Sequence, residues 1–75
     1  NDIAAAAENY LKAAAQPTCS EWLRRRAQLN AGQMFDLLHN RHEAIRQYEL
    51  ASVGGGDQSQ SDAARRYLRT PYTGK

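Results

Sequence analysis

The sequence predicts a small all-α domain. Alanine and other strong helix formers dominate the chain, whereas isoleucine and valine together occur three times. Apolar residues recur at intervals of three and four, which is typical of one face of a helix, and no stretch shows the alternation of a strand. With 75 residues the chain forms one domain at most. We expect three main helices in antiparallel hairpins, followed by a short C-terminal helix.

Composition narrows the classes of function. Hydrophobic residues at 41% and charged residues at 24% indicate a soluble globular protein, not a disordered one. A net charge of +2 indicates no particular partner. The longest apolar run is far shorter than the roughly 20 residues that cross a bilayer, so we expect no membrane span. Because the chain starts at Asn1 without methionine, we expect a processed product, an excised domain or part of a longer chain. The compartment stays open, and secretion after loss of a signal peptide is one alternative.

The first helix is predicted from about Asp2 to Ala15, where alanines are most frequent. Pro17 ends it, because proline restricts the residue before it and has no N–H to donate. Apolar residues at helical spacing predict a stripe for a neighbour to cover. The stripe comprises Ile3, Ala6 or Ala7, Tyr10, Ala13 and Ala14.

The second helix is predicted to begin at Thr18 or Ser20, because Thr18 and Glu21 have the spacing of a capping box. Gly32 lies inside it at a cost of about 1 kcal/mol relative to alanine, which favours a site where another helix comes close. A wide apolar surface is expected from Trp22, Leu23, Leu29, Met34, Phe35, Leu37 and Leu38. The remaining polar face is expected to carry Arg24, Arg25, Arg26, Gln28, Gln33 and Asp36.

The third helix follows a turn at residues 39–41 and is expected to reach about Ser52. Asn40 and Glu43 repeat the capping spacing at its start. Its inner stripe is predicted to be Ala44, Ile45, Tyr48 and Ala51. Its outer face is predicted to carry Glu43, Arg46, Gln47 and Glu49.

The glycines at 54–56 are expected to end the third helix and to open a flexible linker over residues 54–60. A short fourth helix is predicted over residues 61–70, with Ser59 or Asp62 as its cap and Pro71 as its stop. Its apolar side is expected from Ala63, Ala64, Tyr67 and Leu68.

The order Gly32, Phe35, Ala44, Tyr48 and Ala51 resembles the helix–turn–helix unit of the tetratricopeptide repeat (TPR), with its pattern L-G-x2-Y followed by A-x3-F. The resemblance makes residues 20–53 one complete repeat, although Gln28 and Ala31 replace the large residues usual in the first turn.

An upstream trace of the same spacing occurs at Ala6, Tyr10 and Ala13, so residues 1–16 resemble the second half of a preceding repeat. Ala6 and Ala44 lie 38 residues apart, against a family period of about 34. Residues 61–70 resemble the capping extension after the last repeat of bacterial TPR proteins. The resemblance therefore implies a fragment of an α-solenoid, a class of protein that binds other proteins.

The sequence shows no recognisable set of catalytic or ligand-binding residues. His39 precedes the third helix and is out of register with His42, and no Cys or Asp cluster completes a four-ligand metal site. Cys19 is a lone cysteine, either a half-buried residue or, outside the cell, a thiol that pairs between chains. We expect no enzyme activity, no cofactor and no small-molecule substrate.

Two arginine clusters, at residues 24–26 and at residues 65, 66 and 69, are spread around their helices and diluted by acidic residues. This pattern favours solvated faces, or contacts to a partner's carboxylates, over nucleic-acid binding.

About three stacked repeats are usually needed for stability, and this chain has roughly one and a half. We therefore expect a protein–protein interaction module that self-assembles head to tail into a larger or filamentous homo-oligomer. The alternative is an adaptor fragment that binds a peptide in a groove between helices. Interface candidates are Arg24, Arg25, Asn30, Gln33, Tyr67 and Tyr72.

Overall fold

The computed structural model describes residues 2–53 and 58–74, and these residues form helices without strands. The helices are α1 (Ile3–Ala14), α2 (Glu21–Leu37), α3 (Arg41–Ala51) and α4 (Gln58–Arg69). The predicted all-α class is confirmed. The predicted glycine stop at 54–56 lies outside the described residues. None of the described helices is both long and apolar enough to cross a membrane.

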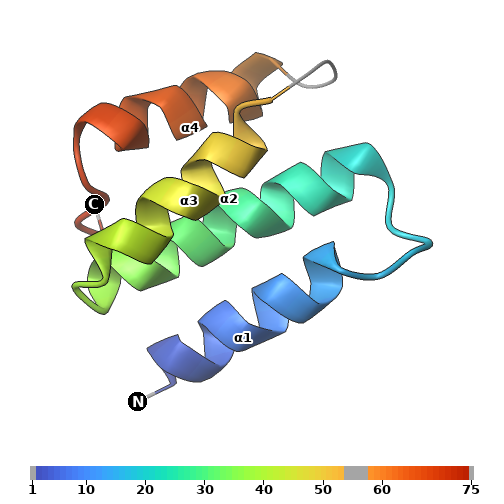
Figure 1. Cartoon of the computed structure of the whole chain (residues 1–75), viewed down its shortest axis with the longest axis horizontal. Coiled ribbons are helices and arrows are strands. Elements are labelled where there is room, and N and C mark those ends of the chain that lie inside the picture. Colours follow the sequence, from blue (N-terminus) through green and yellow to red (C-terminus); the bar gives the residue numbers. More distant parts are fainter. Residues whose placement is uncertain (1, 54–57, 75) are drawn as a thin grey trace.

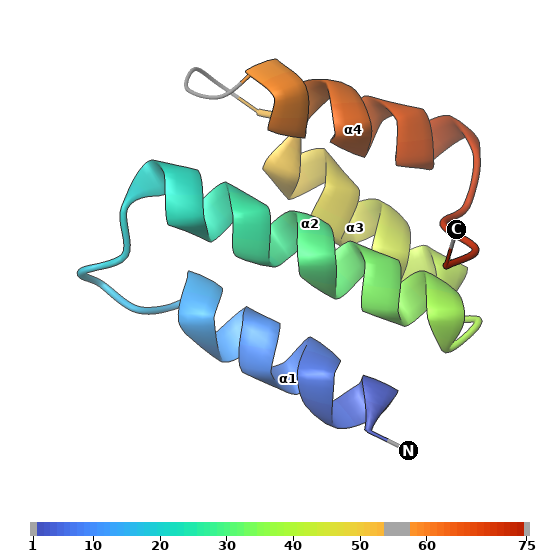
Figure 2. The ribbon, with the colours of Figure 1, turned by 180° about the vertical axis from the view of Figure 1, so that it is seen from behind.

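Successive helices run in opposite directions and stack in chain order (Figure 1). α2 packs against α1 on one side and against α3 on the other, and α4 lies on α3 and also touches α2. Within the described residues α1 contacts no helix except α2. α1 and α4 therefore form the two outer layers of the stack, as the opposite view also shows (Figure 2).

The helix boundaries correct three sequence expectations. Ser20, not Thr18, caps α2, since its Oγ accepts a hydrogen bond from the backbone N–H of Leu23 at 3.2 Å. α4 starts at Gln58, so the end of the expected linker is helical, and Ser59 and Asp62 lie within the helix instead of capping it. The sequence misplaced this start because several polar residues in a row resemble a linker.

α2 ends in a Schellman motif that sets up the turn into α3. The N–H of Asn40 donates to the carbonyl of Phe35 at 2.8 Å, and the N–H of His39 donates to that of Asp36 at 3.0 Å. His39 has a φ of 62°, the left-handed conformation that this motif requires. Asn40 then caps α3, as predicted, by accepting from the N–H of Glu43 at 3.4 Å.

The core is made mostly of small residues. Its buried apolar members are Ala7, Ala27, Leu29, Ala31, Ala44, Tyr48, Ala51 and Ala64. Because six of these eight are alanines, the helix backbones can approach one another closely, and Tyr48 is the largest fully buried side chain among the described residues.

Two polar residues that the sequence placed outside are buried. Asp36 is 8% exposed and Gln47 is 5% exposed. Gln47 donates to the Glu43 carboxylate at 3.1 Å, one turn away on the same helix, whereas Asp36 is bonded to α3 and to the C-terminal tail. The prediction for Asp36 failed because the angular pattern of a helix does not reveal that a polar side chain will find partners across an interface.

Candidate functional site

Gly32 on α2 lies directly against the ring of Tyr48 on α3. A Cβ atom at Gly32 would lie 2.5 Å from Cε1 and 2.7 Å from Cδ1 of this ring, closer than packed carbon atoms approach. Ala44 and Ala51 lie one turn to either side of Tyr48 and have no exposed surface, and Phe35 packs against the same cluster. The residues selected by the repeat resemblance therefore meet at the contact between α2 and α3.

The upstream residues of the same pattern are arranged differently. Ala6 and Tyr10 are half-buried and Ala13 is exposed, whereas Ala7 is the buried residue of α1. Of the predicted stripe, Ala7 is therefore buried, Ala13 is exposed, and the other members are half-buried.

Asp36 joins α2 to α3 and to the C-terminal tail. Its Oδ2 accepts a hydrogen bond from the Tyr48 hydroxyl at 2.7 Å and another from the backbone N–H of Tyr72 at 2.9 Å. Nη1 of Arg41 donates to both carboxylate oxygens, at 3.1 and 3.0 Å. A carboxylate with a side chain 2% exposed requires such partners, because an unpaired buried charge is strongly unfavourable.

Arg41 and three tyrosines extend this network to α4. Nη2 of Arg41 donates to the carbonyls of Tyr67 and Leu68, at 2.7 and 2.9 Å, near the C-terminus of α4, where a cation is favourable. The Tyr67 ring lies 5.5 Å from that of Tyr48 and 5.4 Å from that of Tyr72. Tyr67 and Tyr72, predicted as interface anchors, are thus half-buried parts of the fold.

The same contacts set the protonation of Tyr48. Burial raises the pKa of the Tyr48 hydroxyl, and the hydrogen bond and negative charge of Asp36 raise it further. The hydroxyl therefore stays protonated and acts as a donor, which is a structural role.

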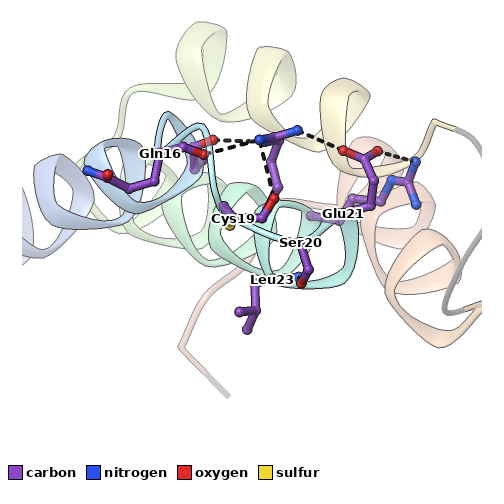
Figure 3. A network of polar contacts seen from close by, with 8 residues as sticks. Gln16, Cys19, Ser20, Glu21 and Leu23 are labelled. Atoms are coloured by element: carbon purple, nitrogen blue, oxygen red, sulfur yellow. Dashed lines mark hydrogen bonds and ion pairs between the residues drawn. The ribbon is translucent and has the colours of Figure 1, made fainter.

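The side chain of Arg24 connects the end of α1 to the start of α2. Figure 3 shows the surrounding polar contacts, with its partners Gln16, Cys19 and Glu21 labelled. The Nε of Arg24 donates to the carbonyl of Ala14 at 2.9 Å, so it satisfies a carbonyl at the end of α1, and its Nη2 donates to the carbonyl of Gln16 at 3.2 Å in the loop that follows. Nη1 pairs with Glu21 at 2.7 Å, and Arg25 pairs with the other oxygen of Glu21 at 3.0 Å. The two arginines predicted as clamps for a partner are therefore engaged within the chain.

A groove between α1 and α2 contains one of the other predicted interface residues. It has a volume of about 270 Å³ and mostly apolar walls, and Asn30 lines it. Its remaining lining residues are Tyr10, Ala13, Cys19, Leu23, Arg26 and Ala27. Gln33 is half-buried on α2 and does not line this groove.

A second hollow, here named the Glu8 hollow, opens between α1 and the C-terminal half of α2. It has a volume of about 370 Å³ and is lined by Ala4, Ala5, Ala7, Glu8, Phe35 and Leu38. Glu8 is its only charged lining residue, and Glu8 is exposed. The hollow thus combines apolar walls with a single carboxylate.

The opposite side of the stack carries the α4 outer face, defined by Asp62, Arg65, Arg66 and Arg69. All four are exposed, and Arg65 pairs with Asp62 at 3.6 Å. A space of about 530 Å³ among these side chains has, among the described residues, a lining that comes entirely from residues 62–70. No other described helix lines this space, so it is an open surface and not an enclosed site.

The described residues contain no group of three or more histidine, cysteine, aspartate or glutamate side chains placed to hold a metal ion. Sequence reasoning missed Asp36 and Arg41, whose hydrogen bonds link α2, α3, α4 and the tail. One signal could have found Asp36: it lies four residues after Gly32, on the helix face that contacts α3. In comparisons with known proteins, no family model matches this chain, and no curated protein or solved structure is significantly similar to it.

Proposed function

We propose that this chain is a non-enzymatic helical module that associates with other protein chains, in particular with copies of itself. Within this proposal residues 20–53 act as one TPR-like unit, flanked by a half repeat and a capping helix. The close approach of Gly32 to Tyr48 and the burial of Ala44 and Ala51 support this assignment.

The observation that carries the proposal is the position of α1. Among the described helices it packs on α2 alone, and Ala4, Ala5 and Ala13 are exposed on it. Small side chains let a neighbouring helix approach closely, as the alanines of the core do within the chain. A further helix therefore has room to pack on α1.

The chemical difference between the two outer layers favours head-to-tail contact over a symmetric dimer. α1 offers alanines and the Glu8 carboxylate, whereas the far side of α4 carries Arg65, Arg66 and Arg69. A contact between unlike surfaces either closes into a ring or continues as a filament.

Sedimentation velocity over a concentration series tests the proposal. We expect species larger than the 8.4 kDa chain at micromolar concentrations, in proportions that rise with concentration. A fully helical monomer at every concentration up to the millimolar range would rule out self-association.

The alternative is a peptide-binding adaptor, and the apolar groove between α1 and α2 favours it. Leu23 is 52% exposed at this groove, and Asn30 supplies an amide beside it, a combination found in peptide sites. Peptides selected from a random library against the chain should lose binding to the Leu23→Asp variant. Selected peptides that bind this variant equally well would exclude the groove as their site.

A further inference from the structure

The chemistry of the Glu8 hollow suits one kind of side chain. Phe35 of α2 and Leu38, the residue after α2, form apolar walls together with the alanines of α1, and an aliphatic stem can cover these walls. Glu8 supplies a carboxylate that forms no ion pair among the described residues. An arginine meets both conditions, because its stem is apolar and its guanidinium binds a carboxylate and stacks on an aromatic ring.

Within the described part of the chain two arginines of α4 are free for such a contact. The side chains of Arg66 and Arg69 form no ion pair or hydrogen bond among the described residues, whereas Arg65 pairs with Asp62. Both are exposed and lie three residues apart, on the same face of α4.

We propose that the Glu8 hollow of one copy receives Arg66 or Arg69 from the α4 outer face of a second copy. This inference rests on the proposed self-association and names the surfaces that carry it. The opposite charges of Glu8 and the two arginines steer the contact and fix which face meets which.

An intramolecular version of this contact is excluded by the fold. α1 and α4 do not touch and lie on opposite sides of the stack (Figures 1 and 2). After each contact, one end of the assembly still has a free Glu8 hollow and the other end still has free arginines. Further copies can therefore join at the ends, and the assembly grows head to tail.

Charge reversal tests the pairing. Glu8→Arg, and separately the double variant Arg66→Glu with Arg69→Glu, should each weaken self-association by on the order of tenfold or more, measured by sedimentation velocity. Glu49→Arg and Arg46→Glu are the matched controls: both residues are exposed on α3 and away from these surfaces, and both variants should associate like the wild type. Circular dichroism verifies that every variant remains helical.

Mixing the two variants gives a second, stricter readout. Glu8→Arg offers an arginine where the double variant offers glutamates, so an equimolar mixture should recover association that neither variant shows alone.

The outcomes separate this inference from the proposed function. A wild type that associates, together with a Glu8→Arg variant that associates equally well, overturns the arginine contact and leaves self-association standing. Loss without recovery in the mixture also overturns the pairing. A wild type that stays monomeric overturns both proposals.

Discussion

Replacing Gly32 by alanine tests how closely α2 and α3 approach each other. The new methyl group would lie 2.5 Å from Cε1 and 2.7 Å from Cδ1 of Tyr48. The ring cannot easily move aside, because its hydroxyl is bonded to Asp36 at 2.7 Å and its face lies against Tyr67.

Two opposing effects decide the result. Alanine is favoured over glycine inside a helix by about 1 kcal/mol, which alone would stabilise the fold. Forcing an extra methyl into a packed core costs about 1–3 kcal/mol, and displacing the Tyr48 hydroxyl from Asp36 adds about 1–3 kcal/mol. We therefore expect a net loss of about 1–5 kcal/mol in the free energy of unfolding.

Urea denaturation followed by circular dichroism measures this loss. The pair Arg26→Ala and Arg26→Gly, at an exposed position of the same helix, measures the helix-propensity term alone. In a double-mutant cycle the change Tyr48→Leu should cost less when Gly32 is already alanine, because a smaller side chain leaves room for the methyl group. If Gly32→Ala raises stability by about 1 kcal/mol, propensity alone governs the site and the close contact is refuted.

Three further outcomes follow from the contacts described above. Tyr48→Phe should make the free energy of unfolding less dependent on pH above about 10. In the wild type, the raised pKa of Tyr48 adds stability that is complete below the pKa of an unfolded tyrosine, about 10, and is lost as the pH rises above that value. The free energy of unfolding, measured from pH 9 to 12, should therefore fall less steeply in the variant. His39→Gly should raise the free energy of unfolding by about 1 kcal/mol in urea titrations, because glycine adopts the left-handed conformation without steric cost. A lower free energy of unfolding in this variant would contradict the Schellman motif. Arg24→Met should speed hydrogen exchange in α1 and leave exchange in α3 unchanged. The variant loses the hydrogen bond to the Ala14 carbonyl, which contributes about 1 kcal/mol because the arginine is partly exposed. An equal change of the exchange rate in both helices would contradict this role.

Local patterns predicted much of the backbone. Alanine content, apolar spacing and the cap at Asn40 act over a few residues, so the number of helices and most helix ends could be predicted. The glycine inside the second helix predicted that another helix comes close at Gly32, and the structure places the Tyr48 ring there.

The polar network could not be predicted, because its partners are distant in sequence. Asp36 is buried only because Tyr48, Arg41 and the tail supply its hydrogen bonds, and no local pattern reveals those partners. Arg24 appeared free for the same reason, since its acceptors are carbonyls that become available where α1 ends. The association surfaces depend on which helix faces stay uncovered, and only the packing order of the helices decides that.

The tail contact also bears on the order of folding. The bond from the N–H of Tyr72 to Asp36 spans 36 residues, whereas the contact between Gly32 and Tyr48 lies within a hairpin. Closing the longer loop costs more chain entropy, so the α2–α3 hairpin should form before α4 and the tail dock on it. Asp36 would then be buried last, and substitutions that break the Tyr72 contact should change the unfolding rate more than the folding rate.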